Sequence, residues 1–361
     1  MKNDVFFFSN PFGFGPSSRI GILMNVSKAM WKNSRIHYVA SNECSEILSN
    51  NGIHIISANQ RNTNEIREIL FSYKNPYVIS SLNRFAIKIA HEQKYPNCFV
   101  DGLAWMWNKI PQDYLLTDMY FALNFPGIDE KIKNHPKLIR TPYFIDTLIS
   151  TDYIESEVLI NIGGCMNPLT SRLPTAFLKI LAIAISTFNN KDIVLCGGRE
   201  AMNFIKQYLP NNKCVTLKKD LFLATLLHTK HFITTSGLNA TLEAFYYKVP
   251  VSFLMPINLS QYKILKVLHS FDVVTQKITW EDIIEQSLAI NNSSEKSTIL
   301  LFEEIANQIL DNKILLNKTV HKIHDLFKIP TVNKKQKQFI TNLGTNGAEF
   351  IAKTLLKQWG L

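Results

Sequence analysis

Cysteine is scarce in this sequence, and glycine and proline are not abundant. The five cysteines lie far apart and include no C-x-x-C pair, which argues against a disulfide framework and a structural zinc site and favours a reducing cytosol. Glycine and proline number 14 each, and charged residues make up 19% of the chain. Collagen-like, coiled-coil and disordered classes are therefore excluded, and we expect a globular cytoplasmic protein.

Long apolar runs are also missing. The first residues, MKNDVFFFSNPFG, contain four clear apolar residues in a row before polar loop residues begin, whereas a signal peptide needs a longer stretch. The most apolar window, residues 176–188, is too short to cross a bilayer and contains Lys179. We expect neither a signal peptide nor a transmembrane segment.

Several patterns of charged residues and histidines are not interpreted as binding sites for nucleic acid or metal. The chain carries a formal charge of +10, which fits nucleic acid, an anionic membrane surface or anionic small substrates. It has no RNP, zinc-finger or helix-turn-helix signature, so we expect no nucleic-acid partner. The basic run at 334–337 is expected to be a solvated loop. The pairs His228/His231 and His321/His324 lack further ligands, so we expect no metal site.

The length and hydropathy pattern predict two domains. The chain has 361 residues, of which 46% are apolar, enough for two cores. Short apolar runs alternate with helical patterns, which is typical of βαβ units with a mostly parallel sheet. The strands are expected at residues 5–8, 37–40, 54–57, 77–80, 97–100, 119–123, 157–162, 192–196, 214–217, 231–234 and 251–254. The clearest helices are expected at 17–31, 174–188, 200–208, 221–227 and 238–247.

These elements form two doubly wound α/β halves of similar size. We predict Rossmann-like domains at 1–150 and 151–340, with a linker near 141–153. A terminal helix follows in 341–361, because Ala348, Ile351, Leu355 and Trp359 fall on one helical face. The sequence does not indicate where that helix packs.

The most informative segment is residues 231–262. A predicted strand leads into a turn of small residues, where Ser236 is a good N-cap and Gly237 allows a ligand to approach the backbone. The helix start is an anion site suited to a pyrophosphate. Asn239 and Glu243 share a helical face, so Glu243 could receive the two hydroxyls of a ribose. The alternative is a capped helix in which Glu243 is only a surface charge.

This segment resembles a known family. The stretches S-G-L-N-A-T-L-E-A, K-V-P and P-I-N-L-S-Q look like the donor-binding segment of GT-B glycosyltransferases that use UDP-sugars. The resemblance implies that the turn and helix start bind the diphosphate, that Glu243 binds the ribose, and that Gln261 reaches the donor sugar. It nominates Ser236, Gly237, Leu238, Asn239, Glu243 and Gln261. It also implies a GT-B architecture, with two Rossmann-like domains facing each other across a cleft.

Two glycine pairs agree with this resemblance. Gly163-Gly164 and Gly197-Gly198 each follow a predicted strand, at the carboxyl edge where open α/β sheets bind ligands. GT-B enzymes place the first such loop near the donor phosphates. Arg199 adds a cation beside the second pair, or is an exposed arginine at a helix start.

The first loop of the amino-terminal half, residues 9–19, reads S-N-P-F-G-F-G-P-S-S-R. It matches neither a P-loop nor G-x-G-x-x-G, but it resembles the glycine-rich first loop of GT-B enzymes. Gly13, Gly15 and Arg19 are therefore candidate substrate-binding residues. Many plant-type members carry a catalytic histidine at this helix start, and this sequence has Ser17, Ser18 and Arg19 instead. That base is therefore absent or lies elsewhere.

Asp101 is the candidate general base. It follows a predicted strand in C-F-V-D-G-L-A-W-M-W, where a carboxylate could accept a proton from a flat nitrogenous acceptor stacked on Trp105 or Trp107. The alternative is an aspartate that caps the next turn, with both tryptophans in the core.

A narrower resemblance follows from three segments together: F-G-F-G-P-S-S-R, V-D-G-L-A-W-M-W and G-L-N-A-T-L-E-A with P-I-N-L-S-Q. They are similar to cytosylglucuronate synthases of peptidyl-nucleoside antibiotic pathways, which join cytosine or hydroxymethylcytosine to glucuronic acid from UDP-glucuronate. This resemblance implies an arginine for the glucuronate carboxylate, and Arg19 and Arg199 are the candidates.

We therefore expect an inverting glycosyltransferase. Its donor substrate would be a UDP-sugar, its acceptor a small nitrogenous molecule, and it would need no further cofactor. The alternatives are an enzyme like the UDP-sugar 2-epimerases, a glycosyltransferase-like subunit that binds without turnover, and transfer to a lipid-linked acceptor at a membrane. A homodimer stays open.

Overall fold

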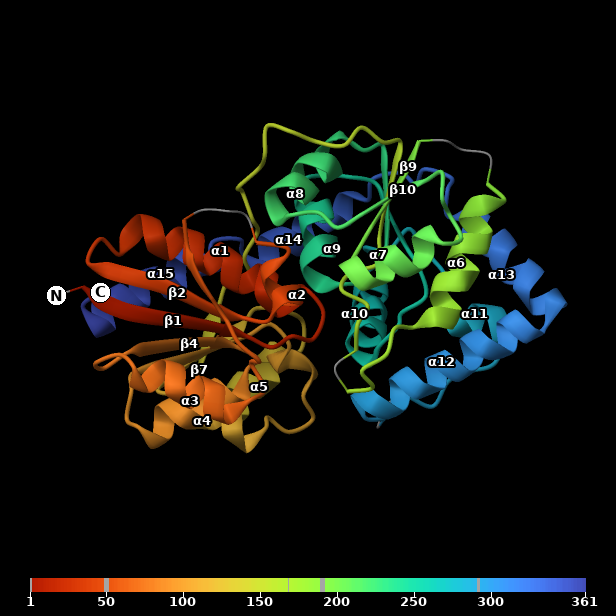
Figure 1. The fold of residues 1–361 in the computed structure, drawn as a ribbon. Helices are drawn as coiled ribbons and strands as arrows, with labels where there is room; N and C mark the ends of the chain where they lie inside the picture. The colour runs from red at the N-terminus through yellow and green to blue at the C-terminus, as the bar shows by residue number, and fades with distance from the viewer. Residues whose placement is uncertain (1, 49–51, 168, 189–191, 291–292) are drawn as a thin grey trace. The chain divides into compact units, whose positions relative to one another are not determined.

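The computed structural model describes residues 2–48, 52–167, 169–188, 192–290 and 293–361. The chain divides into two compact units, each built on a parallel sheet (Figure 1). The first unit comprises Met1–Asp146 and Thr341–Leu361, and the second comprises Thr147–Ile340. In the described ranges, no helix has both the length and the apolar character needed to span a bilayer.

The sheet of the first unit has the order β3-β2-β1-β4-β5-β6-β7, with every neighbouring pair parallel. Its strands are β1 (Asn3–Ser9), β2 (Ser34–Ala40), β3 (His54–Ser57), β4 (Tyr77–Ser81), β5 (Asn97–Asp101), β6 (Met119–Leu123) and β7 (Leu138–Thr141). The helical segments are α1 (Gly15–Met30), α2 (Asn42–Ser45), α3 (Thr63–Phe71), α4 (Arg84–Glu92), η1 (Ala104–Met106), η2 (Gln112–Leu116), α5 (Ile128–Asn134) and, at the end of the chain, α15 (Gly347–Trp359).

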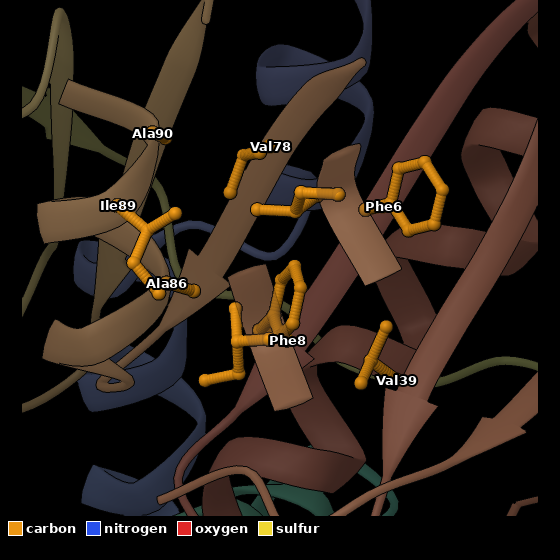
Figure 2. Packing of buried hydrophobic residues seen from close by; sticks show 9 residues of the cluster. Phe6, Phe8, Val39, Val78, Ala86, Ile89 and Ala90 are labelled. Atoms are coloured by element: carbon orange, nitrogen blue, oxygen red, sulfur yellow. The ribbon is translucent and has the colours of Figure 1, made fainter. Parts of the chain in front are cut away.

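Alternation along β1 gives this sheet two apolar faces. Phe6 and Phe8 point to the face covered by α3 and α4, where they pack with the buried side chains shown in Figure 2. Phe7 points to the other face and stacks near Trp31, with ring centroids 6.2 Å apart. Because a fully buried side chain of this size contributes about 1.5–3 kcal/mol, the strand is fixed from both sides.

The terminal helix α15 belongs to the first unit, where it packs against α1. Ile351 and Leu355 are fully buried, as the apolar spacing predicted. Trp31 Nε1 donates a hydrogen bond to the carbonyl oxygen of Ala352 at 3.0 Å. The chain therefore returns to cover the sheet that it formed first.

The sheet of the second unit has the order β10-β9-β8-β11-β12-β13. Its strands are β8 (Val158–Asn161), β9 (Ile193–Cys196), β10 (Lys213–Val215), β11 (His231–Thr234), β12 (Val251–Phe253) and β13 (Gln276–Lys277). The helices are α6 (Thr175–Ser186), α7 (Arg199–Lys206), α8 (Lys219–His228), α9 (Leu238–Tyr246), α10 (Leu259–Ser270), α11 (Trp280–Ile284), α12 (Glu295–Asp311), α13 (Lys313–Asp325) and α14 (Lys334–Leu343).

One local expectation is wrong. The basic run at 334–337, expected to be a loop, forms the first turn of α14. The reason is that the Asn333 side chain accepts a hydrogen bond from the backbone N–H of Lys335 at 2.9 Å, which stabilises a helix start. Gln336 of the same turn is buried and donates to the carbonyl oxygen of Val273.

Both sheets share a feature that decides where a ligand can bind. In each sheet, the first strand of the unit lies between the second and the fourth. Thus β1 lies between β2 and β4, and β8 lies between β9 and β11. At such a point the connections leave to opposite faces, and a crevice opens at the carboxyl ends of the strands. The α/β class and the doubly wound plan predicted from the sequence are confirmed.

Candidate functional site

In the second unit, β8 and β11 end side by side, and Asn161 joins the loops that follow them. Its carbonyl oxygen accepts from the backbone N–H of Thr235 at 3.2 Å. Its side-chain oxygen accepts from the backbone N–H of Gly163 at 2.9 Å. Sequence reasoning did not single out Asn161, although its place just before a glycine pair at the end of a strand was a usable signal.

The structure brings the two glycine pairs together. The backbone N–H of Gly198 donates to the carbonyl oxygen of Gly163 at 2.9 Å, and a Cβ atom on Gly198 would collide with the carbonyl oxygen of Gly164. Gly198 therefore permits close packing of two loops. Gly163 has a φ of +68°, and no atom of the described residues, its chain neighbours apart, lies within 4 Å of its Cβ position. The space beside Gly163 is therefore open, while its backbone N–H and carbonyl groups are already paired with Asn161 and Gly198. Arg199 begins α7 and is exposed.

The start of α9 differs from the prediction. The N-cap is Gly237, and the helix begins at Leu238, so Ser236 is not the cap. The Ser236 hydroxyl is fully buried and donates to the carbonyl oxygen of Gln261 at 2.7 Å, which turns it away from the helix. Gly237, the N-cap, has no side chain with which to cap α9. A helix start without a side-chain cap suits an anion that accepts from its first N–H groups.

Gln261 lies in the first turn of α10 and connects that helix to the loop after β11. Its Oε1 accepts from the backbone N–H of Ile257 at 2.9 Å, and its Nε2 donates to Thr235 Oγ1 at 3.2 Å. The side chain thus has a structural role in holding the loops at the carboxyl edge. Its contact with a donor sugar stays a prediction.

Glu243 is buried, so its interpretation as a surface charge is wrong. Only 1% of its surface is exposed, and its two carboxylate oxygens accept from Lys219 Nζ at 2.6 and 2.5 Å. The sequence did not reveal Lys219, because the helix was expected at 221–227 and begins instead at Lys219. The ion pair joins the first residue of α8 to the middle of α9.

In the first unit, Asp101 is the last residue of β5 and is fully buried. Its Oδ1 accepts from the backbone N–H of Leu103 at 2.6 Å, and its Oδ2 accepts from Trp107 Nε1 at 2.9 Å and from the Tyr120 hydroxyl at 2.6 Å. Burial raises the pKa of Asp101, and the donors oppose that rise. The base role stays a prediction.

Arg19 lies beside Asp101. It is 3% exposed, and its guanidinium covers Gly102 so closely that a Cβ atom there would be 2.6 Å from Nη1. The positive charge of Arg19 also opposes the rise in the pKa of Asp101. Gly15 lies at the edge of this group, with its Cβ position 3.9 Å from Arg19 Nη1. The structure therefore brings Asp101 together with Gly15 and Arg19, which the sequence nominated from a different segment.

The two tryptophans have different environments. Trp105 is 8% exposed, and its ring centroid lies 4.7 Å from that of Phe125, so it fills the core as the alternative interpretation held. Trp107 is half-buried and 6.2 Å from the Tyr114 ring. Gly13 has a φ of +62° and no atom within 4 Å of its Cβ position.

Within the part of the chain that the structure describes, no three His, Cys, Asp or Glu side chains are grouped so that they could hold a metal ion. All five cysteines are free thiols, and four of them are buried.

No family model matches the chain, and no curated protein does. Solved structures do match. A UDP complex of MnaA from S. aureus is 12% identical, with a TM-score of 0.56 over 99% of this chain and 97% of that one. A UDP-GlcNAc 2-epimerase from Neisseria meningitidis, bound to UDP-GlcNAc, is 14% identical, with a TM-score of 0.55 over 99% of this chain and 100% of that one.

A UDP-glucosyltransferase from Polygonum tinctorium that glucosylates indoxyl is 13% identical, with a TM-score of 0.52 over 100% of this chain and 99% of that one. Such low identities over nearly full lengths show a shared fold. The chain has a GT-B fold. Its fold neighbours include both UDP-sugar glycosyltransferases and UDP-GlcNAc 2-epimerases, and they leave the narrower resemblance to cytosylglucuronate synthases a prediction.

Proposed function

We propose that this chain is a UDP-sugar-dependent glycosyltransferase. The observation that supports this most strongly is the β8/β11 switch point of the second unit. There, the open space beside Gly163 and the start of α9, whose N-cap Gly237 has no side chain, follow adjacent strands that are joined through Asn161. Backbone N–H groups and a helix dipole at a switch point suit a diphosphate, and the same groups would stabilise negative charge on a departing UDP.

The nucleotide would extend from that point along α9. In this proposal Gly163, Gly164, Ser236, Gly237, Leu238 and Asn239 surround the diphosphate. Glu243 receives the ribose hydroxyls and Gln261 meets the sugar. Gln261 and Ser236 also hold the loops in place, so the position of the donor depends on both. No further cofactor is required for this chemistry.

The acceptor would bind in the first unit, beside Asp101 and Trp107. The acceptor nitrogen attacks the anomeric carbon, the bond from that carbon to the diphosphate oxygen breaks, and the acceptor proton passes to Asp101. A single displacement of this kind inverts the anomeric centre. Among the described residues, Asp101 Oδ1 accepts one hydrogen bond, from the backbone N–H of Leu103, and a carboxylate oxygen has two lone pairs. One lone pair of Oδ1 can therefore take the proton.

UDP-glucuronate and cytosine are the substrates that we propose to test first. Guanidinium groups bind carboxylates in a bidentate manner, and Arg19 and Arg199 are the two candidates. Arg19 is buried beside Asp101 in the first unit, and Arg199 is exposed at the start of α7 in the second unit. We place the protein in the cytoplasm, since its five thiols are unpaired.

A thermal-shift screen of UDP-sugars, followed by mass analysis of products with cytosine present, tests this function. A ligand at one hundred times its Kd stabilises the folded state by about 2.7 kcal/mol, so the donor should stand out. A new glycoside and free UDP are the expected products. Consumption of UDP-sugar without an acceptor would instead favour a 2-epimerase. Binding without turnover would favour a non-catalytic subunit, and no response to any uridine nucleotide would overturn the proposal.

A further inference from the structure

Lys219 and Glu243 form an ion pair that bridges α8 and α9. Lys219 Nζ lies 2.6 Å from one carboxylate oxygen and 2.5 Å from the other. The ammonium also lies 5.2 Å from the centre of the Phe222 ring, one turn further along α8. Three contacts thus hold the cation in one place.

The pair lies at the edge of the sheet where ligands bind. α8 begins directly after β10 and α9 directly after β11, and helices that follow parallel strands begin at the carboxyl edge. Lys219 is the first residue of α8, while Glu243 lies in the second turn of α9. The cation is therefore close to the edge, and the carboxylate lies somewhat deeper.

The two members of the pair differ in exposure. The side chain of Lys219 is 11% exposed and that of Glu243 is 1% exposed. Lys219 is thus the more exposed member of the pair, and its ammonium is in contact with both carboxylate oxygens. Each carboxylate oxygen can accept more than one hydrogen bond, so the oxygens that Lys219 holds can still receive hydroxyl protons.

We propose that Lys219 is a positioning residue of the nucleotide site, which orients the Glu243 carboxylate so that it accepts both hydroxyls of a ribose. The ligand class is a nucleoside diphosphate with an intact 2′,3′-diol. This inference rests on the proposed function, in which Glu243 meets the ribose. It adds that the preference for a ribose with a 2′,3′-diol over one without it depends on Lys219, which lies in α8, whereas Glu243 lies in α9.

The experiment compares the affinities of UDP and 2′,3′-dideoxy-UDP by calorimetry, for the wild type and for Lys219→Met, Lys219→Arg and Lys230→Met. Lys230 Nζ lies 2.6 Å from a carboxylate oxygen of Glu157 on the exposed surface of the same unit. Lys230→Met is therefore the matched control, because it also removes a lysine from a Lys–Glu ion pair. If Lys219→Met does not fold, Lys219→Gln keeps a donor of similar reach and takes its place.

The wild type should bind UDP at least tenfold more tightly than the dideoxy analogue. Lys219→Met should bring that ratio close to one, Lys219→Arg should restore part of it, and Lys230→Met should leave it unchanged. A ratio that stays the same in Lys219→Met, even with both affinities lowered, would show a merely structural pair and overturn the inference. A higher ratio would show that Lys219 competes with the ribose, which also overturns it.

If the proposed function itself is wrong, the same binding experiment gives a different result. If the wild type binds neither nucleotide, the UDP-sugar function falls. If the wild type binds both equally, UDP binding stands and only the role of Glu243 and Lys219 falls.

Discussion

The guanidinium of Arg19 occupies the space where a side chain at position 102 would lie. A Cβ atom on Gly102 would be 2.6 Å from Nη1 and 2.8 Å from Cζ of Arg19. Glycine at this position therefore lets α1 place a buried cation over the end of β5. The same contact puts that cation next to Asp101, whose pKa it helps to restrain.

Substitution Gly102→Ala tests this packing. The added methyl group must displace Arg19, and overpacking of a buried site costs about 1–3 kcal/mol, so we expect a loss of that size in the free energy of unfolding in urea. Gly15→Ala is the matched control, because its Cβ atom would lie 3.9 Å from the same guanidinium. It should leave stability nearly unchanged. Equal stabilities of the two variants would contradict the close contact.

Substitution Tyr120→Phe tests Asp101 as the base. The Tyr120 hydroxyl donates to Asp101 Oδ2 at 2.6 Å and lowers its pKa. Without this donor the pKa of Asp101 should rise further, and because a base must be deprotonated, the acid limb of the rate profile should move to higher pH. Asp101→Asn should lower the transfer rate about 100-fold or more while UDP binding persists. An acid limb that does not move would argue for another base.

Substitution Leu355→Ala tests the packing of α15. Leu355 is fully buried in the first unit, and truncation of a buried leucine costs about 2–5 kcal/mol. Lys353 is its control on the same helix, because its side chain is 66% exposed and pairs with the exposed Glu349. Lys353→Ala should change stability by less than about 0.5 kcal/mol. A small effect of Leu355→Ala on the unfolding midpoint would show that α15 contributes little.

His231 should make stability depend on pH. Its Nε2 lies 2.8 Å from Ser252 Oγ, and burial lowers its pKa from 6.5 to about 4. The unfolded chain therefore binds the proton more readily, so the contribution is present above pH 6.5 and is lost as the pH falls toward 4. This group should account for up to about 3 kcal/mol over that range.

Urea denaturation at pH 4.5 and 7 measures this pH dependence. His231→Gln, which keeps a donor toward Ser252, should show a smaller difference in unfolding free energy between the two pH values than the wild type. His321→Asn, at a side chain that is 81% exposed, serves as the control and should follow the wild type. If His231→Gln also follows the wild type, His231 is not the group responsible.

The sequence predicted the strands that are buried on both faces, because continuous apolar runs such as those of β1 and β11 are typical of a parallel sheet. It missed β7, an edge strand in which Leu138 and Thr141 are buried, Ile139 is half-buried and Arg140 is exposed. It also missed β13, which has two residues. A strand of two residues leaves almost no hydropathy pattern, whereas β3, an edge strand as short as β7, was predicted at its observed bounds.

Candidate site residues can be nominated from the sequence where a local backbone feature marks them, but a side-chain partner that is distant in the sequence cannot be predicted in this way. Gly163 is such a backbone feature, with its positive φ at the end of a strand. Lys219 and Glu243 are 24 residues apart in sequence, and nothing local links them. Ser236 looked like an N-cap until the carbonyl of Gln261, on another helix, proved to be its partner.

The return of the chain to its first unit sets an order of events during synthesis. β1 to β7 leave the ribosome first, yet α15, which covers α1, is translated only after the whole second unit. Domains generally fold as units while the chain emerges, so the second unit can be complete while the first still exposes the apolar surface that Ile351 and Leu355 will cover. The first unit is thus the part that is most prone to aggregation during synthesis. This holds until α15 packs against α1 and covers the apolar surface.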